Sequence, residues 1–224
     1  MKIGDVEIEF LGHAGFLILI NGKRVAIDPY NVSDDIEKVD VILITHPHFD
    51  HCSIKDIEKL SRDGTHIVMP IGAQSKVNKI DNVSFKIDII TVGIKSKVEG
   101  ISIYPFPAYN IGKEFHPKNE GWIGYIIKSE EAVIYHAGDT DKIPEMEDLK
   151  YIKEEGKKFI VLLPVSGTYV MTAEEAVEVA EQIEPSISIP MHYGAGVAGN
   201  LEDAEKFVSL CKEKDLNAQV LERI

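Results

Sequence analysis

The sequence predicts an α/β fold, a layered sandwich with an internal pseudo-repeat, and three observations support this prediction. Short apolar runs of strand length recur along the 224 residues and outnumber the helical patterns. In each half of the chain, a series of such runs precedes a helical pattern. In both halves, apolar runs end in polar loops that contain histidine. No Gly-x-Gly-x-x-Gly motif follows the first strand pattern, so a doubly wound nucleotide-binding fold is disfavoured.

The expected strands can be followed in order. Residues 6–11 and 16–20 are short apolar runs, and Asn21-Gly22, a strong hairpin signal, precedes the next run at 24–27. Residues 40–45 (DVILIT) are apolar almost throughout, which favours a strand buried on both faces. The remaining expected strands cover residues 66–70, 84–92, 101–106, 122–128, 132–136, 159–165 and 186–191.

Three helices are expected. Thr172 and Glu175 have the spacing of a capping box, and apolar residues at helical spacing follow until Pro185. Ser53 is an N-cap candidate for a helix over 54–60, and residues 204–212 are amphipathic. The length and the content of 44% hydrophobic and 27% charged residues predict one globular domain over residues 1–224.

Composition limits the partners and the compartment. Lys and Arg number 24 against 37 Asp and Glu, so the net charge is −13, and we expect no large nucleic-acid surface. The two cysteines, Cys52 and Cys211, cannot form a disulfide framework. Acidic residues interrupt the N-terminal segment, unlike a signal peptide, and no apolar run is long enough to span a membrane. We expect a cytoplasmic protein with a small-molecule substrate, and homo-oligomers are possible.

One short segment indicates metal chemistry. The run at 40–45 leads directly into His46-Pro-His48-Phe-Asp50-His51. In extended backbone, His46 and His48 point to the same side, whereas the adjacent Asp50 and His51 point to different sides. The segment can therefore supply two ions, and two-metal sites place their ions about 3.5–4 Å apart.

Further candidate ligands follow other strand patterns. His116 lies in EFHPKNEGW, Asp139 in HAGDT after the strand at 132–136, and His192 in PMHYG after the strand at 186–191. Each lies beside Gly or Pro in a loop, where the backbone can approach a ligand closely.

The order of these motifs resembles the metallo-β-lactamase-fold hydrolase superfamily. LGHAGF, AYN, YHAGDT and PVSGTYVMTAEEA are further similar to a branch that includes ascorbate-6-phosphate lactonase-like and N-acyl-phosphatidylethanolamine phospholipase D-like proteins. The resemblance implies a four-layer αββα sandwich with the site at one edge. It also implies a ligand set, in which one ion is held by His46, His48 and His116, the second by Asp50, His51 and His192, and both by a bridging Asp139.

The resemblance further implies that Asp28, in the sequence IDP, supports the metal loop by hydrogen bonds. Two divalent ions, with Zn²⁺ first and Mn²⁺ or Fe²⁺ as alternatives, suit these ligands. A hydroxide bridging them is a nucleophile at neutral pH, and Asp50 can orient it. We expect hydrolysis of an ester, lactone or phosphodiester bond in a small anionic metabolite. A di-iron redox or oxygen-handling protein and a non-enzymatic metal-binding protein are the alternatives.

Other polar residues near the motifs receive separate hypotheses. His13 in LGHAGF and His136 in HAGDT are candidates for catalytic or supporting roles close to the metals. Four residues are candidates for substrate contact: Tyr109, Asn110, Lys113 and Tyr193. His66, in a strand pattern without a partner motif, and Cys52, which fits a small buried packing residue, are read as structural.

Overall fold

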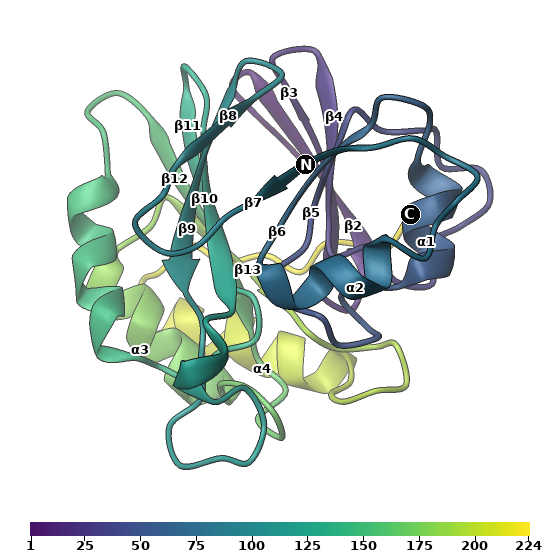
Figure 1. The fold of residues 1–224 in the computed structure, drawn as a ribbon. Helices are drawn as coiled ribbons and strands as arrows, with labels where there is room; N and C mark the ends of the chain where they lie inside the picture. Colours follow the sequence, from purple (N-terminus) through teal and green to yellow (C-terminus); the bar gives the residue numbers. More distant parts are fainter.

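The computed structural model covers residues 1–224 and contains two mixed β-sheets that pack face to face (Figure 1). The first sheet has the strand order β1 (Lys2–Ile3), β2 (Val6–Gly12), β3 (Gly15–Ile20), β4 (Lys23–Ile27), β5 (Val41–Leu43), β6 (His66–Met69) and β7 (Lys86–Ile89). The second sheet has the order β13 (Ile187–Met191), β12 (Lys158–Pro164), β11 (Ala132–His136), β10 (Ile123–Lys128), β9 (Ile101–Pro107) and β8 (Ser96–Val98).

The two sheets share one pattern of strand directions. In the first sheet β1 to β4 are antiparallel, and β4 to β7 are parallel. In the second sheet β8 to β11 are antiparallel, and β11 to β13 are parallel. This repetition agrees with the predicted pseudo-repeat. It also places the carboxyl ends of β2, β5, β9, β11 and β13 at the same edge of the sandwich, where loops from both halves can meet.

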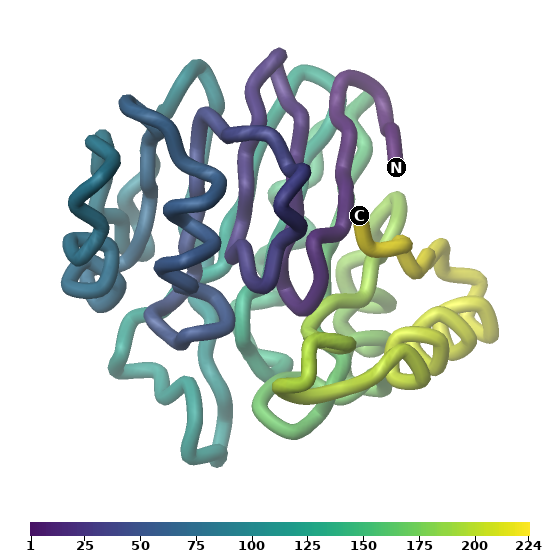
Figure 2. The backbone as a smooth tube through the Cα atoms, turned by 90° about the vertical axis from the view of Figure 1, so that its right-hand side faces the viewer, coloured from purple at the N-terminus to yellow at the C-terminus, as the bar shows by residue number.

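Helices cover the outer faces of both sheets. The helices α1 (Ile54–Leu60) and α2 (Gln74–Val77), with the 3₁₀ turn η1 (Ile71–Ala73), pack on the outer face of the first sheet. The helices α3 (Ala173–Ile183) and α4 (Leu201–Glu213), with η3 (Pro144–Ile152), pack against the second sheet. A short turn, η2 (Lys118–Glu120), precedes β10. The layers therefore follow the expected αββα order, and Figure 2 shows α1 in front of the first sheet.

The core between the sheets also positions the loop after β5. The largest apolar cluster contains inward-facing residues of both sheets together with α3 and α4. Within it, Tyr125 of β10 donates its hydroxyl to the carbonyl of Ile44 at 2.7 Å and contacts the carbonyl of Val68 at 3.0 Å. A side chain of the second sheet thus satisfies backbone groups at the ends of two strands of the first sheet, directly before the histidine-rich segment.

The predicted elements agree with the structure except at the edges. The capping box forms, since Thr172 accepts from the amide of Glu175 and the Glu175 carboxylate accepts from the amide of Thr172. α4 begins earlier than expected because Asn200 and Asp203 form a second capping box. The strand expected at 84–92 is reduced to β7, a largely exposed edge strand, and β1, β8 and α2 were not predicted. None of the helices is long and apolar enough to span a membrane.

Candidate metal centre

Histidine and aspartate side chains from five loops meet at the edge of the sandwich where the carboxyl ends of the strands lie. The loop after β5 contributes four of them, and the others follow β2, β9, β11 and β13; together they are His46, His48, Asp50, His51, His13, His116, Asp139 and His192. All are buried except His48, which is partly exposed.

The first group consists of His46, His48 and His116, whose ligand atoms converge. Nδ1 of His48 lies 3.1 Å from Nε2 of His46 and 3.1 Å from Nε2 of His116. Nδ1 of His46 donates to Thr45 Oγ1, and Nδ1 of His116 donates to the carbonyl of Tyr169, so both Nε2 atoms carry lone pairs when the rings are neutral. Nitrogen ligands of one tetrahedral zinc ion lie roughly 3.3 Å apart, given Zn–N bonds of about 2.0–2.1 Å. The two measured edges are therefore close to this spacing, and all three ligand atoms lie within 4.8 Å of one another.

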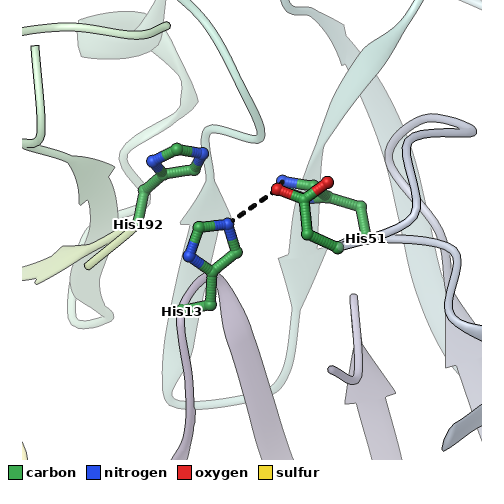
Figure 3. Close-up of side chains that lie close together, drawn as sticks. His13, His51 and His192 are labelled. Atoms are coloured by element: carbon green, nitrogen blue, oxygen red, sulfur yellow. Dashed lines mark hydrogen bonds and ion pairs between the residues drawn. The ribbon is translucent and has the colours of Figure 1, made fainter. Parts of the chain in front are cut away.

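The second group consists of His13, Asp50, His51 and His192, with one ligand atom of each within 4.8 Å of the others. Figure 3 shows the three histidines side by side, and its dashed line is the contact of His13 Nε2 with Asp50 Oδ2 at 2.9 Å. The ring centroids of His13 and His192 are 4.2 Å apart. The structure thus brings His13 into the group that the resemblance assigned to Asp50, His51 and His192 alone.

Asp139 lies between the two groups. Its Oδ2 is 3.2 Å from Nε2 of His116, in the first group, and 3.1 Å from Nε2 of His192, in the second. Its Oδ1 is 3.2 Å from Nε2 of His51. One carboxylate therefore faces histidines of both groups, which is the arrangement that a bridging ligand requires.

Asp28 orients two of the histidines from outside. Its Oδ1 accepts the backbone amide of Thr45 at 2.8 Å, and its Oδ2 accepts the Thr45 hydroxyl at 2.5 Å and Nδ1 of His51 at 2.7 Å. Because Thr45 Oγ1 in turn accepts Nδ1–H of His46, one buried carboxylate fixes the tautomers of His46 and His51. In both rings Nε2 is left to face the centre.

Two further residues that the sequence did not suggest, Ser166 and Trp122, contact histidines of the centre. Nδ1 of His192 forms a hydrogen bond with Ser166 Oγ at 2.8 Å. The indole ring of Trp122 packs against the rings of His46 and His48, with centroid separations of 5.0 and 4.8 Å. Ser166 stands within the PVSGT segment and Trp122 is the only tryptophan of the chain, but neither signal specifies a contact with a histidine.

Four of these residues have left-handed backbone conformations. The φ angles are 56° at His13, 42° at Asp28, 58° at His116 and 64° at His192. A non-glycine residue in this region costs about 1–3 kcal/mol, and such strain concentrates at functional sites. Three of these left-handed residues, His13, Asp28 and His192, directly follow a strand, and His116 lies in the loop between β9 and β10.

Burial and charge set the protonation of the centre. Burial lowers the pKa of His46 well below its usual value. Burial acts in the same direction on His51, but the charges of Asp139 and Asp28 outweigh it and hold the pKa of His51 well above 6.5. Burial would raise the pKa of Asp139, but His192 and His51 hold it well below its usual range. The centre therefore holds an ionised Asp139 and a neutral His46, whereas His51 favours its protonated form and would have to release that proton to bind a metal ion.

Unpartnered atoms show that the donor set fits metal ions. His13 Nδ1 is buried without a hydrogen-bond partner, and the buried His51 Nε2 and Asp139 Oδ1 face each other at 3.2 Å without hydrogen-bond geometry. Buried polar atoms are rarely left without a partner, and buried charges are paired or coordinate metals. Imidazole and carboxylate ligands suit Zn²⁺, Mn²⁺ and Fe²⁺. The residues therefore fit a divalent metal centre.

His136 is not part of either group. It is fully buried at the end of β11, its Nε2 lies 2.8 Å from the carbonyl of Ala14, and its Nδ1 accepts the amide of Gly138. Both ring nitrogens thus bond to the backbone, and the contacts fix the turn that leads to Asp139. His66 also lies apart from the centre, with Nε2 3.2 Å from Asp88.

The four residues expected to contact substrate are occupied elsewhere. The hydroxyl of Tyr109 donates to Glu145, and the amide of Asn110 donates to the carbonyls of Phe115 and Tyr169. The ammonium of Lys113 pairs with Asp141 at 2.5 Å and donates to the carbonyl of Val170, and the ring of Tyr193 stacks on Phe10. These contacts support the loops around His116 and His192, and none of the four residues lines the cavity at the metal centre.

A cavity of about 550 Å³ opens over the centre. Metal-group residues form part of its wall, and the rest of the wall includes Tyr30, Phe49, Phe115, Tyr169 and Val197. The sequence reasoning missed these apolar residues. Phe49 stands between His48 and Asp50, and Phe115 precedes His116, so adjacency to a ligand was the signal that could have found two of them.

Comparisons with known proteins identify the family of the chain. The chain matches the family model of the beta-lactamase superfamily domain over residues 7–192. A UPF0173 metal-dependent hydrolase of Methanopyrus kandleri is 32% identical over 230 residues, and the match covers 96% of both chains. Another from Pyrococcus horikoshii is 30% identical and covers 93% of both. The crystal structure of a protein described as a metal-dependent hydrolase of Parabacteroides distasonis has a TM-score of 0.81 at 27% identity, covering 98% of this chain and 94% of that one. The chain belongs to the UPF0173 metal-dependent hydrolases of the metallo-β-lactamase superfamily.

Proposed function

We propose that this enzyme binds two divalent cations, one at each histidine group, and hydrolyses an ester, lactone or phosphodiester bond. The position of Asp139 carries the proposal, because its two carboxylate oxygens face Nε2 atoms of both groups at 3.1–3.2 Å. A carboxylate so placed suits a pair of ions about 3.5–4 Å apart. Zinc is the first choice of metal, and manganese or iron fits the same ligands.

Two cations at this centre would lower the pKa of a bound water and polarise the oxygen of the scissile group. Asp50 would orient the attacking water from the protein side. It lines the cavity, and its Oδ2 is occupied by His13, which leaves Oδ1 to accept a hydrogen bond from that water. Burial would raise the pKa of Asp50, but the hydrogen bond from His13 and the charge of His51 lower it, so the group is ionised at neutral pH. His13 is then a positioning residue for Asp50.

The similarity of LGHAGF, YHAGDT and PVSGTYVMTAEEA to the ascorbate-6-phosphate lactonase-like and N-acyl-phosphatidylethanolamine phospholipase D-like branch supports this range of bonds. A lactone and a phosphodiester both present a polarised oxygen and a leaving oxygen to the same nucleophile. Measuring the turnover of one ester, one lactone and one phosphodiester therefore decides which bond the enzyme cleaves.

The test combines metal content with turnover. The purified protein is expected to contain two equivalents of metal, and to hydrolyse a p-nitrophenyl ester, a lactone or bis-p-nitrophenyl phosphate. His48→Ala should remove about one equivalent and abolish turnover, and Asp50→Ala should do the same through the second group. His66→Ala is the matched control, because His66 pairs with Asp88 outside the centre. Full activity of a metal-free preparation in chelator would refute the proposal.

A further inference from the structure

Four of the eleven residues that line the cavity over the metal centre are tyrosine or phenylalanine. Tyr30 and Phe49 form one pair, with ring centroids 5.8 Å apart and planes at 77°. Phe115 and Tyr169 form another, with centroids 4.8 Å apart and planes at 74°. All four residues line the same cavity as His48 and His116. Edge-to-face pairs of this kind present ring surface to a third apolar group.

The two pairs come from different parts of the chain. Tyr30 follows β4 and Phe49 lies in the loop after β5, whereas Phe115 lies between β9 and β10 and Tyr169 between β12 and α3. The side chains at the opening are unusually accessible for their type, since Phe49 is 60% exposed and Phe115 is 45% exposed. Exposed aromatic side chains that flank a cavity mark a place where a ligand covers them.

No Lys or Arg side chain lines this cavity. Lys113 and Lys118 lie in the same loop as Phe115, and both form ion pairs, Lys113 with Asp141 at 2.5 Å and Lys118 with Glu145 at 2.8 Å. The polar part of the wall consists of the histidines and carboxylates of the metal groups and of two tyrosines, Tyr30 and Tyr169. With no Lys or Arg in the wall, a negative charge on the substrate would be balanced only at the metal ions, where the scissile group binds.

We infer that the substrate carries, next to its scissile bond, a neutral apolar or aromatic group that packs between the Tyr30–Phe49 and Phe115–Tyr169 pairs. This inference rests on the proposed hydrolase function and narrows its substrate class. It favours esters and lactones of apolar acids or alcohols over small phosphorylated or multiply charged metabolites. It therefore departs from the anionic substrate expected from the sequence. A volume of about 550 Å³ is enough for a ring or a short alkyl chain in addition to the reacting group.

Hydroxamates test the inference without relying on turnover. Acetohydroxamate, phenylacetohydroxamate and the hydroxamate of succinic acid share one metal-chelating group and differ in a small, an aromatic and an anionic tail. Their affinities are measured by the change in the visible spectrum of the cobalt-loaded protein. Phenylacetohydroxamate should bind about tenfold or more tightly than acetohydroxamate, because burial of a phenyl ring is worth at least one factor of ten. The succinic acid derivative should gain nothing over acetohydroxamate.

Two variants locate the effect. Phe49→Ala and Phe115→Ala should each reduce the ratio of phenylacetohydroxamate to acetohydroxamate affinity by about threefold or more. Phe49 is 60% and Phe115 45% exposed, so neither belongs to the buried core and both variants should fold. Tyr151→Ala is the matched control, because Tyr151 is an aromatic residue 74% exposed outside the cavity, and it should leave the ratio unchanged.

The outcomes separate the two claims. Equal affinities for all three hydroxamates, tightest binding of the anionic one, or a ratio unaffected by both phenylalanine variants would overturn the apolar substrate class while the metal centre stands. A protein that takes up no cobalt, and whose spectrum no hydroxamate changes, would overturn the metal centre itself and the inference with it.

Discussion

Replacing Asp28 with Asn tests how far metal affinity depends on a residue outside the proposed ligand set. Asp28 is fully buried and accepts three hydrogen bonds, from the amide and hydroxyl of Thr45 and from Nδ1 of His51. An aspartate can accept all three, because it has two acceptor oxygens. An asparagine of the same shape has one acceptor oxygen, and its NH₂ group must face at least one of the three donors.

The expected magnitude follows from the number of donors left unpaired. One buried donor without a partner costs about 1–3 kcal/mol, so Asp28→Asn should destabilise the metal-free protein by about that amount. Loss of the hydrogen bond that orients a metal-binding histidine lowers metal affinity by about 10–100-fold, which corresponds to about 1.4–2.7 kcal/mol. The loss of stability and the loss of metal affinity can be separated, because stability is measured on the metal-free protein and metal affinity under conditions where the protein stays folded.

The assays are urea unfolding of the metal-free chain and competition for zinc with a chromophoric chelator. Asp88→Asn is the matched control, since Asp88, on the edge strand β7, also pairs with a histidine, His66 of the neighbouring strand β6, away from the centre. It should leave zinc affinity unchanged. A folded Asp28→Asn protein with the zinc affinity of the unmodified chain would show that the outer hydrogen bonds do not prepare the site, and the reasoning would be wrong.

Three further predictions concern the scaffold. Gly124→Ala should destabilise the fold by about 1–3 kcal/mol and lower metal affinity, because a Cβ would lie 2.5 Å from the carbonyl oxygen of His136 and 2.6 Å from that of Ala137. Thermal unfolding measures the loss, and Gly72→Ala is the control, because a Cβ there meets no atom closer than 3.6 Å. Thr172→Ala should lower the free energy of unfolding in urea by about 1 kcal/mol, because it removes the N-cap of α3. Thr172→Ser keeps a hydroxyl at the cap and should leave the free energy of unfolding nearly unchanged. An equal decrease in both variants would argue against the cap. Hydrogen bonds from Lys128 and Lys157 lower the pKa of Glu154 to about 2, so its contribution to stability is present above the unfolded value near 4.5 and is lost as the pH falls from there through about 2. Because that side chain is 37% exposed, Glu154→Gln should cost less than about 1 kcal/mol at pH 7, and this difference from the unmodified chain should vanish in urea titrations near pH 2; a difference independent of pH would contradict the assignment.

Most of the fold could be predicted from local patterns because the central strands and long helices are defined by their own residues. The apolar run at 40–45 and the capping box at Thr172 are examples, and both elements form where expected. β8 and the ends of β7 could not be predicted, because a short edge strand is defined by a partner strand rather than by its own composition.

The candidate site shows the same division. The segment around His46 and His48 indicates a metal site from its residue types alone. His13 and His136 look alike in the sequence, since each ends a strand and has Gly nearby, but the left-handed backbone at His13 turns its ring toward Asp50, whereas His136 remains in β11 with both nitrogens bonded to the backbone. That difference depends on long-range packing, and so does the meeting of Phe49 with Tyr30 over the cavity.

The left-handed corners at His13, Asp28, His116 and His192 also restrict how this site can change over evolutionary time. Histidine, aspartate and asparagine are among the few side chains that enter this backbone region readily, and glycine enters it freely. If a related chain loses its metal while keeping this backbone, strain disfavours alanine or valine at these corners and favours glycine or asparagine. Glycine or asparagine at the four aligned positions of a related chain would therefore indicate that its metal centre has been lost.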